Sequence, residues 1–512
     1  MIPPMGKTLN EYGHHPAGVN MDLEKIRKDA EAFTKELDEE YYQNLGGFKD
    51  ELNISGIYQK YGYLFGRDAV DYVRDMRDKA DGEEKRQLSM LYSFMAGEYI
   101  SNITAEMDEK FMTAEAKATV KVDGKDVPYR SIPSHISNED SRERRSELDA
   151  LTDPVVDELN GILKERMLKL HDLSVELGYE NYIDMVQDMK GIELEPLKEQ
   201  MEQFLNDTEQ AYVDAMNRSL EPFGITIDKA ERHDVSYLFR AKEFDAYFPK
   251  DGVVENWKAT MKGIGIDPDA QKNVILDTEE RPKKHPRAFT MPVEVPDRVI
   301  LVITPHGGQD DYQAMLHEGG HTEHFAHVDR KHPFEYKYLG DVSVSESYAF
   351  IFNYLPTDEL WLKQYVNMDR VEDYLRFAFL NKLFFLRRYA SKLLYEMELH
   401  GRRDIDGMDV RYKEIMEKGL KMRHKANRYL LDVDDGFYVS QYLRAWIFET
   451  QLRKHVIGET QRDWFNSAEA GDILKGLWSY GQKYNVDELA RMLGYEGIDV
   501  APMKEEVIEA LR

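Results

Sequence analysis

The residues best suited to do chemistry lie in one short stretch, in which His317, Glu318 and His321 form the pattern HExxH. Four residues advance about 400° round an α-helix, so the two imidazoles lie about 40° apart on one face and one turn apart along the axis. That arrangement suits two nitrogen ligands of one tetrahedral zinc ion. Glu318 lies on the neighbouring edge of the helix, where it can reach a water molecule beside the metal. The pattern predicts one zinc ion per chain, with Glu318 as the general base.

A third metal ligand must come from elsewhere in the chain. Glu323 is two residues past His321, about 200° round the helix, and faces away from the two imidazoles. Glu346 and Asp341, at the start of a second amphipathic segment, are the candidates. Ser343 and Glu346 also have the spacing of a capping box, which would occupy the carboxylate with a backbone amide. The local pattern therefore leaves the third ligand open.

Two interpretations without a metal compete with this one. The chain has 15 histidines among 512 residues, so an accidental HExxH pattern has a chance of roughly a few per cent. His324 and His327 follow closely, so the segment could also be a histidine-rich helix that faces solvent. Against both, the motif follows directly on a predicted strand and a Gly-Gly turn, as a built site would.

The composition limits what else the chain can be. Of the 512 residues, 42% are hydrophobic and 32% are charged, which is typical of a globular protein, and the net charge is −28. Such an acidic chain lacks the basic face that nucleic acid or an anionic membrane requires, so neither is an expected partner. Because there is no cysteine, disulfides and thiol catalysis are excluded, and any metal must be held by histidines and carboxylates.

No targeting or membrane segment is expected. Residues 1–20 contain no apolar stretch long enough for a signal peptide. The most apolar segment, 374–394, includes Arg376, Arg387 and Arg388, so it predicts a buried helix and not a membrane span. We expect a cytoplasmic location.

Helical periodicity runs through most of the chain and predicts a mainly α protein. Its clearest example starts at Asp153 and continues to Leu177, with apolar residues at steps of three and four. Residues 118–129 predict a hairpin around Asp123-Gly124. Three β-prone runs within 273–304 predict a small antiparallel sheet beside the zinc helix, which is expected near 309–327.

No composition shift marks a domain boundary after the first segment. Residues 1–20, which hold three prolines and three glycines, predict an extended N-terminal arm. Residues 21–512 predict a single catalytic unit.

The motif and its surroundings resemble those of the thimet oligopeptidase and oligoendopeptidase F family. Gly320 precedes the second histidine, His324 lies three residues beyond it, and Glu346 lies twenty-five beyond it. These features are also similar to angiotensin-converting enzyme and to the HExxH carboxypeptidases of the Taq type. The resemblance implies that Glu346 is the third zinc ligand. It also implies two mostly helical, interleaved halves around a deep substrate channel that admits peptides but not folded proteins.

Further candidate residues come from the same resemblance. Tyr438 and Tyr442, near Trp446, are similar to the tyrosine-bearing segment opposite the zinc, where a phenol would donate to the oxyanion; such a pair can also serve packing alone. The family carries a histidine shortly before these tyrosines, whereas the nearest one here is His424, so that role is unassigned. His306, in a Pro-His-Gly-Gly turn, is a candidate for contact with the substrate backbone, or simply a turn residue.

These observations predict a zinc-dependent metallopeptidase that hydrolyses short peptides, with strand 298–304 available to pair with an extended substrate. One alternative is a carboxypeptidase or dipeptidyl carboxypeptidase, which needs a cation to hold the terminal carboxylate. Another is a non-catalytic, zinc-containing peptide-binding protein. Glu318 argues against the latter, because a structural zinc site needs no base and usually has four protein ligands. The sequence does not determine the oligomeric state.

Overall fold

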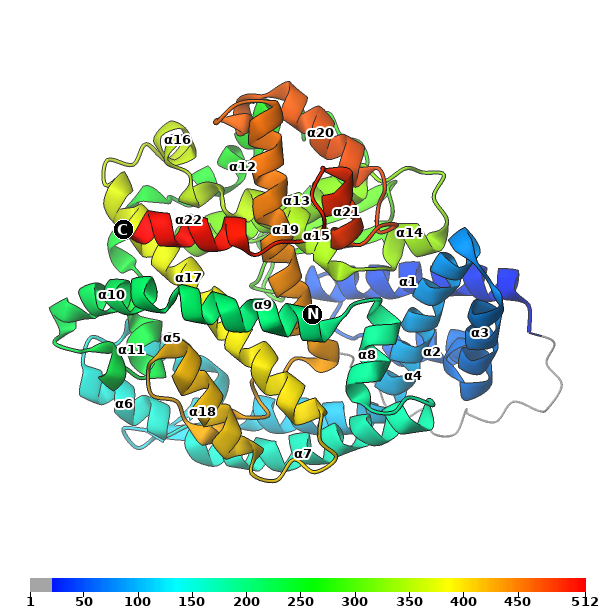
Figure 1. Cartoon of the computed structure of the whole chain (residues 1–512), viewed down its shortest axis with the longest axis horizontal. Coiled ribbons are helices and arrows are strands. Elements are labelled where there is room, and N and C mark those ends of the chain that lie inside the picture. The colour runs from blue at the N-terminus through cyan, green and yellow to red at the C-terminus, as the bar shows by residue number, and fades with distance from the viewer. Residues whose placement is uncertain (1–20) are drawn as a thin grey trace.

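The computed structural model describes residues 21–512, and the predicted arm at 1–20 lies outside these described residues. Helices dominate the described chain, so the mainly α prediction is confirmed (Figure 1). The helices of the first half are α1 (Leu23–Leu45), α2 (Ile54–Tyr61), α3 (Arg67–Lys79), α4 (Gly82–Lys117), α5 (Ile132–Asn138), α6 (Arg142–Ala150), α7 (Asp153–Glu176), α8 (Tyr182–Lys190), α9 (Leu194–Asp207), α10 (Glu209–Leu220), α11 (Arg232–Leu238) and α12 (Gly252–Gly263). Those of the second half are α13 (Gln309–Ala326), α14 (Phe334–Tyr338), α15 (Val342–Asn353), α16 (Glu359–Trp361), α17 (Val371–His400), α18 (Met408–Leu420), α19 (Tyr438–Glu459), α20 (Ala468–Trp478), α21 (Val486–Met492) and α22 (Ala501–Leu511).

Two large hydrophobic cores hold these helices together, and the chain passes between them more than once. The first core is built by α1–α4, α7–α11 and α18, with α22 and parts of α17 and α19. The second is built by α12, α13, α15, α20 and α21, with the remaining parts of α17 and α19. The two cores are therefore built from segments that alternate along the chain.

Two long helices join the cores. The start of α17 packs in the second core and its later part, from Leu380, packs in the first. In α19 the order is reversed, since residues up to Ile447 belong to the first core and those from Phe448 to the second. Figure 1 shows both helices crossing the middle of the molecule. Side chains on their central turns consequently lie at the junction of the two bodies.

The strands form two small sheets. β1 (Thr119–Val122) and β2 (Lys125–Pro128) are antiparallel and turn at Asp123-Gly124, as predicted. β3 (Val274–Asp277), β4 (Phe289–Glu294) and β5 (Arg298–Val302) form a second sheet in the order β3-β5-β4.

The second sheet was predicted to be antiparallel, and this is wrong for one of its two strand pairs. β4 and β5 are antiparallel, but β3 runs parallel to its neighbour β5, because the β4–β5 hairpin places β5 between β3 and β4 instead of at the end of a meander. β5 is therefore the central strand with both edges occupied, so it cannot pair with a peptide as the sequence suggested. Among the described strands, β4 carries the free edge nearest α13.

The sheet links the zinc-motif helix to α1. Side chains of β5 alternate between its two faces: Leu301 packs in the second core with α13, and Ile300 and Val302 pack with Tyr41 and Tyr42 of α1. In residues 21–512, no helix combines the length and the apolar character that crossing a membrane would require.

Candidate metal centre

The predicted zinc-motif helix is present as α13, which follows β5 and the Gly307-Gly308 turn. Because His317 and His321 are four residues apart on this helix, their rings lie side by side with nearly perpendicular planes, and 3.2 Å separates the two Nε2 atoms. Both side chains are partly exposed, so the pair is accessible from one side.

The two glycines inside the motif allow α13 to lie close to its neighbours. A Cβ atom on Gly320 would come within 2.6 Å of the Tyr348 carbonyl oxygen and 2.7 Å of Ala349 Cα, both in the backbone of α15. A Cβ atom on Gly319 would come within 2.0 Å of Trp257 Nε1. The close approach of α13 and α15 is what brings Glu346 to the histidines.

Glu346 is the third member of the group. Its Oε2 atom lies 3.5 Å from His317 Nε2 and 3.8 Å from His321 Nε2. The carboxylate is buried, and Oε2 has no hydrogen-bond partner among the described residues. Asp341 is the residue that caps α15, by accepting from the Ser343 amide (3.0 Å), and it also accepts from Arg444 (3.0 Å). The capping-box alternative is therefore absent, and Glu346 is left free to bind a cation.

The spacing of the three donors fits a zinc ion. Two ligands at about 2.0–2.1 Å from a tetrahedral zinc lie roughly 3.3 Å apart. The observed separations are 3.2, 3.5 and 3.8 Å. In residues 21–512, this is the only group of three histidine or carboxylate side chains with such closely placed donor atoms. Two imidazoles and one carboxylate form a donor set typical of catalytic zinc sites, with one coordination position left open.

The protonation states suit the same ligand. Burial lowers the pKa of His317 to about 4 and that of His321 well below its usual value, so both rings are neutral and have a lone pair to offer. Burial also raises the pKa of the Glu346 carboxyl to about 7. A buried carboxylate whose free oxygen faces two neutral imidazoles lacks a countercharge, and a divalent cation would supply one.

Ser345 holds the orientation of His321, a role that the sequence did not reveal. Its Oγ atom lies 2.7 Å from His321 Nδ1 and 3.0 Å from Nδ1 of the buried His324. When His321 Nε2 serves as a ligand, its Nδ1–H donates to Ser345 Oγ and fixes the tautomer. The contact joins two helices, so no spacing within either segment could have predicted it.

Glu318 lies beside the cluster but is not part of it. Burial, and secondly the charge of Glu346, raise the pKa of its carboxyl to about 8. Its backbone carbonyl accepts a hydrogen bond from Thr290 Oγ1 of β4 (2.7 Å), which ties the motif helix to the edge strand. The carboxyl group of Glu318 is thus close enough to that of Glu346 for the two charges to interact.

The two tyrosines have different environments. Tyr438 Oη donates to Glu346 Oε1 (2.9 Å), so it holds the third ligand in place. Tyr442 packs on Tyr438, with ring centroids 5.0 Å apart, and on Phe350. Burial, with the charges of Glu346 and of Glu318 contributing, raises the pKa of the Tyr442 phenol. The Tyr442 phenol is thus protonated and lies near both carboxylates.

Other predicted residues are not brought to the cluster. His306 is exposed at the turn before α13, eleven residues ahead of His317, and its backbone N–H donates to Asp311. His424 lines a separate cavity, where its backbone N–H donates to Glu417 (3.1 Å). Glu323 is buried and accepts from Gln271, so it faces away from the two imidazoles, as the helix geometry predicted.

Comparison with known proteins finds solved structures of similar fold but no relative by sequence. No protein-family model and no curated protein matches the chain. A complex of Pz peptidase A with an inhibitor matches with a TM-score of 0.69 and 14% identity, over 96% of this chain and 92% of that one. A protein named as an oligoendopeptidase F, from Bacillus anthracis, matches with a TM-score of 0.63 and 14% identity, over 99% and 97%. Another structure named as oligoendopeptidase F gives 0.68 and 13%, over 96% and 90%. The chain has the fold of these proteins along nearly its whole length.

Proposed function

We propose that this protein is a zinc-dependent peptidase that hydrolyses short peptides. The observation that carries the proposal is the cluster of His317, His321 and Glu346, with Glu318 beside it; these are three donors, where a tetrahedral zinc takes four. Its support from outside the chain is a fold shared with proteins named as peptidases.

Each residue of the site has its own role in hydrolysis. A zinc ion held by His317, His321 and Glu346 would supply a Lewis acid that lowers the pKa of water and polarises a peptide carbonyl. Glu318 takes a proton from the attacking water and passes it to the leaving amine. Tyr442 donates a hydrogen bond to the oxyanion that forms on the scissile carbonyl, and Tyr438 keeps Glu346 in position.

The edge of β4 is the feature that would align the substrate. Thr290 of this strand contacts the backbone of Glu318, and the side of β4 that faces away from β5 has no partner strand among residues 21–512. An extended peptide paired with this edge would be held mainly by backbone hydrogen bonds, which select little for side chains. This arrangement suits an enzyme that accepts many short peptides.

Metal analysis and peptide hydrolysis test the proposal together. We expect about one zinc per chain after reconstitution, and cleavage of blocked peptides that stops on chelation and returns with zinc. Mass spectrometry of the products identifies the bond cleaved. Stoichiometric zinc with no hydrolysis of any peptide, blocked or unblocked, would favour the non-catalytic alternative and contradict the proposal.

A further inference from the structure

A cavity of about 600 Å³ lies next to Tyr438 and is distinct from the one that His424 lines. It is bounded by the beginnings of α4, α15 and α19, by the end of α8 and by the segment 482–488. Tyr438 lines this cavity and also donates to Glu346. A ligand in the cavity would therefore contact the residue that holds the third member of the metal cluster.

The carboxylates of this cavity are all engaged. Each of the four forms an ion pair with an arginine at 3.0 Å or less: Asp188 with Arg77, Asp341 with Arg444, Asp435 with Arg166, and Glu488 with Arg86. None of them is left to balance a further cation.

Lys190, at the end of α8, brings such a cation to the cavity. Among the described residues its ammonium has no hydrogen bond or ion pair, and Nζ lies 3.4 Å from where a Cβ atom on Gly436, just before α19, would be. Burial lowers the pKa of Lys190 to about 8, so the group is still largely protonated at neutral pH. The exposed Lys85 of α4 lines the same cavity, and within residues 21–512 its ammonium has no partner either.

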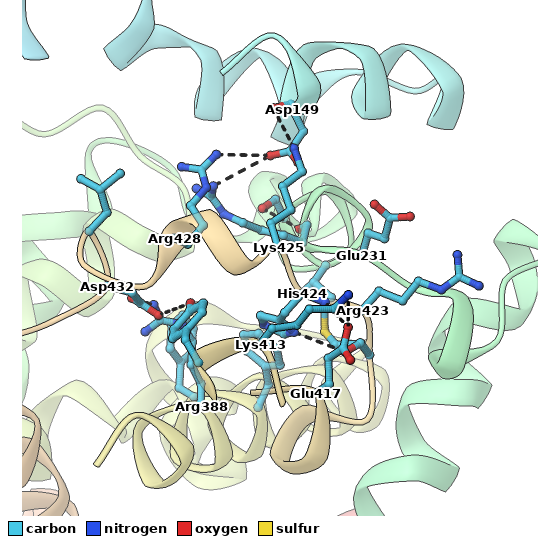
Figure 2. Close-up of a pocket in the computed structure, with 18 of the residues that line it drawn as sticks. Asp149, Glu231, Arg388, Lys413, Glu417, Arg423, His424, Lys425, Arg428 and Asp432 are labelled. Atoms are coloured by element: carbon cyan, nitrogen blue, oxygen red, sulfur yellow. Dashed lines mark hydrogen bonds and ion pairs between the residues drawn. The ribbon is translucent and has the colours of Figure 1, made fainter. Parts of the chain in front are cut away.

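The cavity around His424 shows how cations are balanced elsewhere in this protein (Figure 2). There Lys425 pairs with Asp149 (2.7 Å), and Arg388 pairs with Asp432. Figure 2 shows these side chains directed at their partners. In the part of the chain that the structure describes, Lys190 has no such carboxylate, so its charge is available to a ligand.

Two buried amides add to the polar lining. Gln441, near the beginning of α19, is 3% exposed, and Gln482 is 6% exposed. The amide oxygen of each is buried without a hydrogen-bond partner among the described residues, so the amide nitrogen is the end with access to the cavity. An unpaired amide inside a protein costs free energy, and a polar ligand would remove that cost.

The beginning of α19 borders the same space. No side chain caps this helix, and its first turn contains no acidic residue. The N–H groups at the start of a helix carry partial positive charge, which favours an anion there. The cavity thus combines unpaired ammonium groups, amide donors and a helix start, and its carboxylates are already neutralised.

We infer that this cavity binds the phosphate group of a small phosphorylated molecule, held by Lys190, Gln441, Gln482 and the beginning of α19. A phosphate monoester has a charge of about −1.5 to −2 at pH 7 and three strong acceptor oxygens, so it can engage several of these donors at once. A chloride ion or a single carboxylate would leave most of them unpaired. The volume lies within the range of small-molecule pockets, roughly 300–1,000 Å³, which leaves room for an organic group on the phosphate.

Calorimetric titration of the full-length protein tests the inference, with glycerol 3-phosphate, inorganic phosphate, acetate and chloride as the probes. We expect glycerol 3-phosphate to bind at one site per chain, more tightly than inorganic phosphate and at least roughly 10-fold more tightly than acetate or chloride. Lys190→Gln should weaken this binding roughly 10- to 100-fold, the value of a charge-assisted hydrogen bond, and Gln441→Leu roughly 3- to 10-fold. Neither side chain has a partner to lose, so both variants should fold. Lys110→Gln, an exposed lysine toward the other end of α4, is the control and should bind as the wild type does.

Three results would overturn the inference. The first is binding that persists at full strength in Lys190→Gln, as expected if phosphate were held by a zinc ion alone. The second is acetate or chloride bound as tightly as the phosphates, which would mean a site for any anion. The third is inorganic phosphate bound more tightly than its ester, which would exclude a phosphorylated molecule as the ligand. The titration does not depend on turnover, so a failure of the proposed peptidase function would leave its result unchanged.

Discussion

Two pairs of imidazoles face each other inside this protein, and they have different surroundings. His317 Nε2 and His321 Nε2 are 3.2 Å apart, and His171 Nε2 and His400 Nδ1 are 3.0 Å apart. Burial lowers the pKa of all four rings, so both pairs are neutral. By histidine geometry and protonation alone, the two pairs are equivalent.

The difference lies in the third neighbour. Glu346 Oε2 lies within 3.8 Å of both rings of the first pair. In the second pair, His400 stacks on Tyr182, with ring centroids 4.3 Å apart, and packs against Phe437. These aromatic rings pack against the imidazole but give a cation no anionic ligand. The carboxylate is thus what makes the first histidine pair a candidate metal centre, and the second pair lacks one.

Replacing one histidine of each pair in turn should give the largest difference between two variants. His317→Ala should lose zinc, with an affinity loss greater than the roughly 10- to 100-fold typical of outer-shell partners, and with it all turnover. His400→Ala should keep one zinc per chain and lose about 1–3 kcal/mol of stability, because His171 is left buried without its partner. Metal analysis and thermal unfolding measure both. Zinc retained at full stoichiometry in His317→Ala would contradict the assignment.

Glu318→Gln separates catalysis from metal binding within the first pair. If Glu318 is a base and not a ligand, as proposed, zinc content should be unchanged, while kcat falls by roughly 100- to 10,000-fold. Peptide affinity should be retained. If this variant lost zinc, and turnover fell only in proportion, Glu318 would be a ligand instead.

Tyr438 and Tyr442 extend the comparison, because their phenols lie close to the carboxylates beside the first histidine pair. Tyr442→Phe should lower kcat by about 100- to 1,000-fold with little change in KM, as expected for one lost oxyanion donor. Tyr438→Phe should instead weaken zinc binding by roughly 10- to 100-fold, because it releases Glu346. Each variant is the control for the other. Equal effects on zinc affinity in both variants would refute this division of roles.

The first pair could be predicted from sequence and the second could not, for a geometric reason. His317 and His321 share one helix, so a spacing of four fixes their relation, whereas His171 and His400 are 229 residues apart. Glu346 is an intermediate case: its carboxylate is left free because Asp341 caps α15, and only the resemblance favoured it over that residue.

The fold, too, could be predicted from sequence only where the signals are local. Helical periodicity and the Asp123-Gly124 turn are local signals, and the elements that they predict are present. β3 points in the direction that a meander would give it, but it pairs with β5 and not with β4, and the chain between the strands carries no local signal for that choice. The prediction that β5 would receive the substrate was wrong for the same reason.

The smallest effect expected is a change in the pH dependence of stability at the second pair. His171 and His400 have pKa values lowered by burial from the usual 6.5, so below about pH 6.5 the unfolded chain binds protons that the folded chain does not. The free energy of unfolding therefore falls as the pH decreases from about 6.5, by up to roughly 1.4 kcal/mol per pH unit for each histidine. His400→Gln removes one of these groups, so its stability should fall less steeply between pH 6.5 and 5 than that of the wild type. Urea titrations of the zinc-loaded protein at several pH values measure the two slopes. Parallel slopes would mean that His400 titrates normally in the folded protein, and the likeness between the two pairs would then end at geometry.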